Sequence, residues 1–283
     1  MPLSSCDENR LRLIAKIESS FARAKELEQA GELEKALEAY LFAFDNGHLV
    51  PGWGGVRLSY VPSAIARLGE RLPAATLALS HRRDAREKLI RSGELEFDVI
   101  HEWLALNRYL NEHERELQLL RELKDTGTLD ADLESQIIRE NYERLLEAGE
   151  YKILDAYFDK FGAHFLQSLL NFDCDTLLPP RRKSRGRSKE MAALWSRSIK
   201  KDGRNLYELA LATKRWDHAD EVARRVLSYC PEAESLTLLA ETARRLKRKT
   251  RLKKLCNMAE ELLPADELKK MQREFGITTI YVT

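Results

Sequence analysis

Apolar side chains recur at helical spacing from Asn9 onward. The first stripe advances in steps of three and four residues and consists of Leu11, Ile14, Ile17, Phe21, Ala24 and Leu27. After a break at Gly31, a second stripe follows at Leu33, Ala36, Leu37, Tyr40, Leu41 and Phe44. This pattern predicts an antiparallel helical hairpin. Because each helix has a charged back face and a narrow apolar front, the pair is expected to stack on further pairs.

The hairpin in residues 24–47 also alternates small and large packing residues. Small residues at the closest crossing let two helix backbones approach, and larger residues fill the space beside it. The residues concerned are Ala24, Leu27, Gly31, Ala36, Tyr40 and Ala43. Their intervals resemble those of the tetratricopeptide repeat (TPR) family.

Weaker copies of this pattern follow along the chain. The copies are marked by Leu145, Gly149, Tyr151, Leu154 and Phe158; by Leu206, Trp216, Ala219 and Pro231; and by Leu239, Ala240, Ala243, Ala259 and Pro264. The two prolines are 33 residues apart, close to the period of about 34 residues in that family. Residues 96–127 also read as two helices, but they match the repeat poorly. The resemblance implies an all-α, α-solenoid fold of TPR-like hairpins in a right-handed superhelix, with an ordinary helical bundle as the alternative.

Three segments interrupt the helical pattern. Asp45–Pro62 is rich in glycine and predicts a long connection. Pro179–Lys189 is rich in proline and arginine and predicts an exposed linker. The end of the chain, 276–283, has β-branched residues without helical period and predicts a short strand or an extended tail. The expected organisation is therefore an N-terminal helical region at 1–178, a linker at 179–189 and a C-terminal helical region at 190–283.

The composition supports helices and a location in the cytoplasm. Glycine and proline together are 21 of 283 residues, too few for a β-sandwich or barrel with frequent turns. The N-terminus has acidic residues and no apolar signal core. The longest stretch without a charged side chain, Phe161–Phe172, is shorter than the roughly 20 residues of a membrane span. We therefore expect no membrane contact.

Charge is distributed unevenly along the chain. The formal net charge is +1, but residues 1–178 carry 22 basic and 32 acidic residues, whereas residues 179–283 carry 25 and 14. Such a division favours either polyanion binding by the basic part or head-to-tail association of acidic and basic parts.

No catalytic, cofactor or metal site is expected. Neither a P-loop nor a dinucleotide fingerprint accompanies the glycines, and no nucleophile elbow is present. The histidines are scattered, and the cysteines form no C-x-x-C pair. We expect reduced, largely buried thiols at Cys6, Cys174, Cys230 and Cys256.

The glycine-rich segment offers a candidate partner-binding rim. Trp, Tyr and Arg are enriched at interaction hot spots, and this segment contains His48, Trp53, Arg57 and Tyr60. The alternative is structural, with Trp53 and Tyr60 packing the connection against the helices together with Val56 and Leu58.

Two basic clusters offer a candidate polyanion site. They contain Arg181, Arg182, Lys183, Arg185, Arg187, Arg244, Arg245, Lys247, Arg248, Lys249 and Arg251. Few aromatic residues lie between them, so base stacking is not indicated. The residues and the resemblance together predict a non-enzymatic scaffold for protein–protein interaction, with an acidic partner or a second copy of the chain. The alternative is a protein that binds the backbone of RNA or DNA through its basic half.

Overall fold

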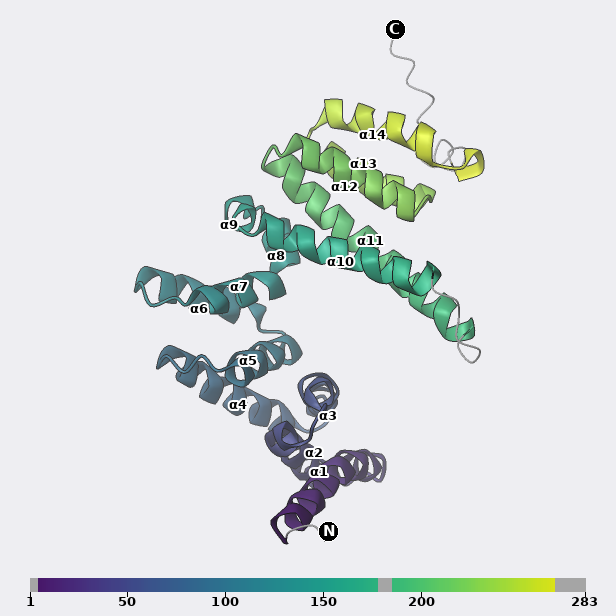
Figure 1. Ribbon diagram of the computed structural model, residues 1–283. Helices are drawn as coiled ribbons and strands as arrows, with labels where there is room; N and C mark the ends of the chain where they lie inside the picture. The colour runs from purple at the N-terminus through teal and green to yellow at the C-terminus, as the bar shows by residue number, and fades with distance from the viewer. Residues whose placement is uncertain (1–4, 178–184, 268–283) are drawn as a thin grey trace. The chain divides into compact units, whose positions relative to one another are not determined.

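The computed structural model describes residues 5–177 and 185–267, and every regular element in them is helical. The chain forms two compact units, unit 1 at Met1–Asn141 and unit 2 at Tyr142–Thr283 (Figure 1). Among the described residues there is no strand, and no described helix is long and apolar enough to cross a membrane. The expected all-α class is therefore confirmed for the described part of the chain. The expected 276–283 tail lies outside it.

Unit 1 contains seven α-helices and two short helical turns within its described residues. The elements are α1 (Ser5–Gln29), α2 (Leu33–Asn46), η1 (Gly47–Leu49), η2 (Val56–Tyr60), α3 (Val61–Gly69), α4 (Pro73–Arg91), α5 (Phe97–Leu110), α6 (His113–Asp125) and α7 (Ala131–Glu140). Helix α1 packs on α2, as the two apolar stripes predict, and α3 packs on α4. The hairpin expected in residues 24–47 is therefore present.

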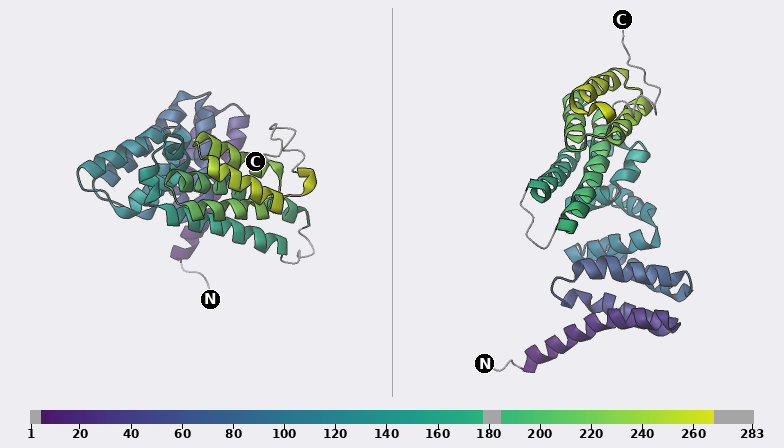
Figure 2. Two further views of the ribbon diagram at one scale, coloured as in Figure 1. Left: turned by 90° about the horizontal axis from the view of Figure 1, so that it is seen from above. Right: turned by 90° about the vertical axis from the view of Figure 1, so that its right-hand side faces the viewer.

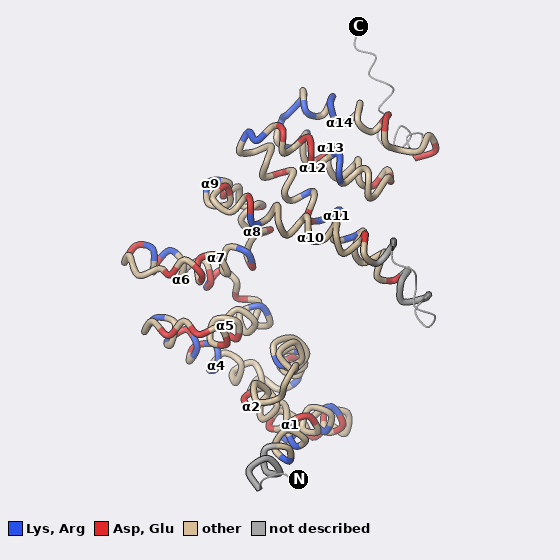
Figure 3. The backbone as a smooth tube through the Cα atoms, viewed as in Figure 1, with Lys and Arg blue, Asp and Glu red and all other residues tan. Residues whose placement is uncertain are grey.

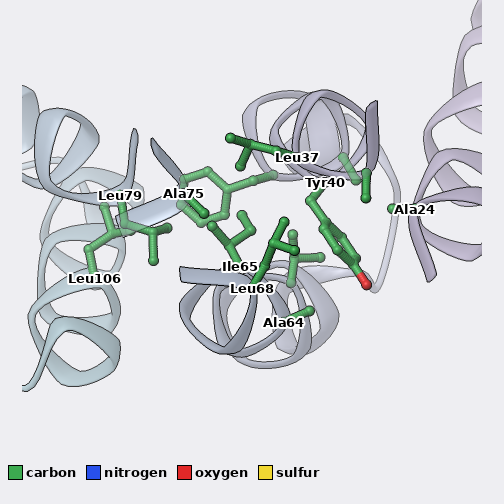
Figure 4. Packing of buried hydrophobic residues seen from close by; sticks show 13 residues of the cluster. Ala24, Leu37, Tyr40, Ala64, Ile65, Leu68, Ala75, Leu79 and Leu106 are labelled. Atoms are coloured by element: carbon green, nitrogen blue, oxygen red, sulfur yellow. The ribbon is translucent and has the colours of Figure 1, made fainter. Parts of the chain in front are cut away.

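The core of unit 1 places small residues where helices cross closely. Ala24, Ala36 and Tyr40 are fully buried, and the ring of Tyr40 lies between α1, α2 and α3 (Figure 4). The Tyr40 hydroxyl donates to Glu28 Oε2 at 2.7 Å, so this buried polar group keeps a partner. Ile65 and Leu68 of α3 close the other side of the cluster.

The glycine-rich segment is not the long open connection that the sequence predicts. Helix α2 continues to Asn46, the chain turns through η1, and helical structure resumes before η2 and runs directly into α3. Gly47 allows this tight path, because a Cβ atom there would lie 3.0 Å from Trp53 Cε3 and 3.1 Å from Arg57 Cδ. Val56 packs partly buried against the core, together with Trp53.

Unit 2 consists of helices throughout its described residues. The elements are α8 (Tyr142–Glu147), α9 (Tyr151–Asp155), α10 (Phe158–Leu177), α11 (Arg185–Ala212), α12 (Trp216–Tyr229), α13 (Ala233–Arg245) and α14 (Lys249–Leu262). Helix α11 packs against α10, α12 and α13, and α14 packs against α12 and α13 (Figure 2). The predicted linker at 179–189 is wrong for residues 185–189, which belong to helix α11. The observed division at Asn141 also precedes the expected one at 178. Residues 178–184 lie outside the described part.

One kind of turn recurs in both units. A residue with positive φ follows the end of a helix, and the next amide donates to the carbonyl five residues earlier, which is the Schellman arrangement. These bonds are Glu32 N to Leu27 O (2.9 Å), Glu94 N to Leu89 O (2.9 Å), Glu112 N to Asn107 O (2.9 Å), Thr128 N to Leu123 O (3.0 Å), Glu150 N to Leu145 O (2.9 Å), Arg215 N to Ala210 O (2.8 Å) and Arg248 N to Ala243 O (2.8 Å). The positive-φ residues of these turns are Gly31, Gly93, Asn111, Gly127, Gly149, Lys214 and Lys247.

Candidate interaction sites

The predicted partner-binding residues of the glycine-rich segment do not form one exposed rim. His48 is exposed, with its Nδ1 at 3.1 Å from the carbonyl oxygen of Asp45, and Tyr60 is 67% exposed. Trp53 is half-buried and meets the ring of Phe21 edge-on at 6.3 Å. The structure therefore leaves His48 and Tyr60 accessible and uses Trp53 mainly for packing.

The prediction that Arg57 belongs to an exposed partner-binding rim is wrong, because this side chain is buried. Its Nε donates to the carbonyl oxygen of Phe44 at 2.9 Å, and its Nη2 is paired with Glu102 of α5. The other Glu102 oxygen accepts from Arg86 Nε of α4 at 2.6 Å. A buried guanidinium needs an anion and hydrogen-bond acceptors, and the interior of unit 1 supplies both.

A second buried carboxylate, Glu87 of α4, lies at the centre of a larger ion-pair array. It accepts hydrogen bonds from Arg91 Nε at 2.9 Å, from Arg115 Nε and from Trp103 Nε1 at 3.4 Å. Burial raises the pKa of Glu87, but the hydrogen bonds and charges of Arg115 and Arg91 outweigh burial and hold this pKa below its ordinary value. Glu87 is therefore ionised at neutral pH. Arg91 also reaches Glu122 at 2.7 Å, which connects α4 to α6.

Arg83 extends the array toward the turn between α5 and α6. Its guanidinium is buried, and it is held by Asp84 at 2.7 Å, by Glu112 and by Asn107 Oδ1 at 3.4 Å. Arg115 reaches Asp84 as well, at 2.9 Å. The array thus ties α4, α5 and α6 together through charged side chains whose positions are mutually fixed.

A groove opens beside this array. Its volume is about 570 Å³, and its lining residues are Glu87, Arg91, Asn111, Glu112, Glu114, Arg115 and Gln118. Arg91 and Arg115 remain 42% and 36% exposed at the side chain, so both can donate hydrogen bonds to a molecule in the groove while remaining paired to Glu87. The groove therefore presents fixed donors and acceptors.

None of these residues was among the candidate sites predicted from the sequence. The signal was present in α4, where Ala75, Leu79 and Ile90 lie on the buried stripe and Arg83 and Glu87 continue it. Charged residues at apolar positions of a helix require buried partners. Those partners are on α5 and α6, so the sequence of α4 alone does not identify them.

The C-terminal basic cluster is only partly available to a partner. Arg245 is paired with the buried Glu208, which also accepts from Tyr151 at 3.1 Å. Arg251 and Lys254 both contact Asp220, at 2.6 and 2.8 Å.

Aromatic stacking occupies a further part of this cluster. The guanidiniums of Arg248 and Arg251 lie 5.4 and 5.0 Å from the centre of the Trp216 ring. The cations that remain exposed and form no ion pair with described residues are Arg244, Lys247, Lys249 and Lys253. Lys and Arg positions gather where α13 ends and α14 begins (Figure 3).

The first basic cluster, at residues 181–187, has no side chain within the described part of the structure. Arg185 and Arg187 belong to the first turns of α11, and Arg181, Arg182 and Lys183 lie outside the described residues.

The thiols differ in exposure, and the expectation that they are largely buried is wrong for Cys174, which is exposed. Burial raises the pKa of Cys230 and Cys256, so both are neutral thiols at physiological pH. The side chain of Cys6 lies outside the described part. Among the described residues, no group of three or more His, Cys, Asp and Glu side chains is arranged to hold a metal ion.

Comparison with protein-family models, curated proteins and solved structures finds no match to this chain. The resemblance to the TPR family therefore rests on the hairpin residues themselves. Of these, Ala24, Ala36, Tyr40 and Ala43 are fully buried, and Gly31 adopts positive φ at the turn.

Proposed function

We propose that this chain is a non-enzymatic, TPR-like helical scaffold that binds another protein. The observation that carries the proposal is the repetition of backbone geometry in unit 2 at an interval of 33 residues. Lys214 and Lys247 both have positive φ, and the amides that follow them, of Arg215 and Arg248, donate to Ala210 and Ala243 over the same 2.8 Å.

The repetition continues through the second helix of each pair. Cys230 N donates to Val226 O at 2.9 Å, and Leu263 N donates to Ala259 O at the same distance. A proline follows each of these amides, at Pro231 and Pro264. An interval of 33 residues is close to the length of one TPR-like hairpin, which favours stacked hairpins over an irregular bundle. A right-handed solenoid is the arrangement that such stacking produces in the family.

The groove of unit 1 offers a bound peptide donors and acceptors that are already fixed in position. Peptide recognition needs donors and acceptors that are held in position before binding, because ordering them on binding costs affinity. In the groove, Glu87 is held by two arginines and a tryptophan, and Glu112 is paired with the buried Arg83.

The charge of the groove favours a protein segment over a phosphate backbone. Three carboxylates, those of Glu87, Glu112 and Glu114, line it beside two guanidiniums. A continuous polyanion would be repelled by these carboxylates, whereas a peptide with a lysine or arginine side chain and free backbone groups complements both signs of charge.

Selection of displayed random peptides on the purified full chain tests this proposal. A selected peptide is then titrated by fluorescence anisotropy against the natural chain and against Glu114→Lys, which alters an exposed lining residue outside the ion-pair array. We expect affinity to fall about tenfold in Glu114→Lys, because the charge that faces the peptide is reversed.

Glu38→Lys is the matched control, since Glu38 is an exposed glutamate of α2 that does not line the groove. It should leave the affinity within about twofold of the natural value. Equal binding by Glu114→Lys and the natural chain, or failure to select any peptide, would contradict the proposal.

A further inference from the structure

Two turns of unit 2 carry lysine at a position that disfavours it. Lys214 and Lys247 have φ of 62° and 56°, in the left-handed region. The equivalent turns elsewhere carry glycine or asparagine, the residue types that adopt this conformation most readily, at Gly31, Gly93, Asn111, Gly127 and Gly149. The geometry of the turn therefore does not account for lysine at either place.

The two turns lie next to each other. Trp216, two residues after Lys214, contacts the guanidinium of Arg248, the residue after Lys247, at 5.4 Å from the ring centre. Arg251 of α14 also bonds to Asp220 of α12 at 2.6 Å, close to the same turns. The side chains of Lys214 and Lys247 consequently belong to one edge of unit 2, where α11 meets α12 and α13 meets α14 (Figure 1).

We define the basic edge as four cations on these two turns and their flanking helices. All four are exposed, and none forms an ion pair with the described residues: Lys214, Arg244, Lys247 and Lys249. No acidic residue occupies the first turn of α14. Like charges this close to one another leave a positive potential that an external anion would neutralise.

Two arginines close to the basic edge are neutralised by carboxylates of the same unit. Arg245 is paired with Glu208, and Arg251 with Asp220. The cations of the basic edge face solvent in the same few turns of helix without such partners. Their charge is therefore available for a contact outside the chain.

We propose that the basic edge binds an acidic segment of another protein, rich in Asp or Glu. The edge lacks the aromatic platform of a single-stranded nucleic-acid site, because Arg248 and Arg251 already cover the ring of Trp216. The exposed Asp217, three residues after Lys214, also interrupts the positive surface along which a phosphate backbone would run. A short carboxylate-rich segment needs only the few cations of the edge.

This inference concerns unit 2 and does not depend on the groove of unit 1. The two surfaces differ in charge, since the groove carries three carboxylates and two guanidiniums whereas the basic edge is defined by cations alone. A peptide selected for the groove therefore serves as an internal standard, because its binding should be unchanged when the basic edge is altered.

The test is a fluorescence anisotropy titration of a labelled poly-glutamate peptide with the full chain. The variant is Lys214→Asn with Lys247→Asn, which removes both charges and uses the residue found at the equivalent turn at Asn111. We expect the natural chain to bind poly-glutamate but not poly-glutamine at an ionic strength of about 0.05 M, with affinity falling as salt is added. The double variant should bind about tenfold more weakly.

The matched control removes two exposed lysines from unit 1, in Lys88→Gln with Lys124→Gln, and should bind poly-glutamate like the natural chain. Circular dichroism checks that each variant is folded. Three results would overturn the inference: no binding of poly-glutamate, equal affinity for the natural chain and the Asn variant, or tighter binding of a single-stranded DNA oligonucleotide that the Asn variant loses.

Discussion

In unit 1, Arg57, Arg83, Glu87 and Glu102 are at most 5% exposed and hold α4, α5, α6 and η2 together. In unit 2, the cations Lys214, Lys247 and Lys249 lie on exposed turns without ion pairs to described residues. Both regions are rich in charge, but a charge contributes to stability only where burial removes water and a partner replaces it. The number of charged residues in a segment therefore does not tell whether they stabilise the fold or remain free to bind.

The largest loss of stability is expected when the buried ion pairs of unit 1 are broken. Glu102→Ala removes the anion shared by Arg57 and Arg86 and leaves Arg57 buried without its charge partner. We expect the free energy of unfolding to fall by about 3–5 kcal/mol. Chemical denaturation measures this change. Arg224→Ala in unit 2, which removes an exposed pair with Glu261, should cost no more than about 0.5 kcal/mol, and similar costs for the two variants would contradict the comparison.

A second prediction concerns Glu87 and acid. Its pKa in the folded chain lies below the ordinary value of 4.5, so its charge stabilises the fold above that value and ceases to do so as pH falls through the folded pKa. At neutral pH, Glu87→Gln should reduce the free energy of unfolding by about 2–3 kcal/mol. Because the Gln variant has no carboxyl group to titrate, the difference should shrink below about pH 4. A constant difference from pH 7 to about pH 3 would show that the charge of Glu87 is not the cause.

The third prediction concerns close apolar packing in unit 2 at Gly203 of α11, which lies against Val226 and Phe165. A Cβ atom at Gly203 would overlap Val226 Cγ2 and lie 3.1 Å from Phe165 Cε2. Gly203→Ala should therefore destabilise the chain by about 2 kcal/mol in denaturant unfolding. Gly162→Ala is the control within helix α10, where a Cβ meets nothing within 4 Å, and it should stabilise by about 0.5–1 kcal/mol. If both variants shift stability in the same direction, close packing at Gly203 is not the cause.

The smallest expected effect concerns the turns. Lys247→Gly relieves a left-handed backbone and should raise the free energy of unfolding by about 0.5 kcal/mol. Gly31→Ala forces an L side chain into the same conformation and should lower it by about 1 kcal/mol. Differential scanning calorimetry compares the two midpoints. A loss of stability in Lys247→Gly would mean that the lysine side chain contributes to the fold, which would weaken its assignment to the basic edge.

The helices and the first hairpin were predictable from sequence because their signals are local. Apolar spacing selects the buried face, and Gly31 marks the turn, where it takes a φ of 81°. The glycine-rich segment was predicted wrongly, since glycines favour turns locally while contacts of Trp53 and Arg57 with distant helices favour a helical path. The groove of unit 1 was missed for the same kind of reason, because Glu87 meets Arg115 only after α4 and α6 pack.

The sequence by itself determined the helical class, the turn at Gly31 and the excess of positive charge toward the C-terminus. Each of these follows from neighbours within a few residues or from composition, so no long-range contact is needed to establish it. Only the tertiary structure decided which charges are neutralised. Arg57 reaches Glu102 and Arg245 reaches Glu208 across tens of residues, whereas Lys214 and Lys247 find no such partner among the described residues. Electrostatic partnership depends on distance in space and on burial, and the folded chain sets both.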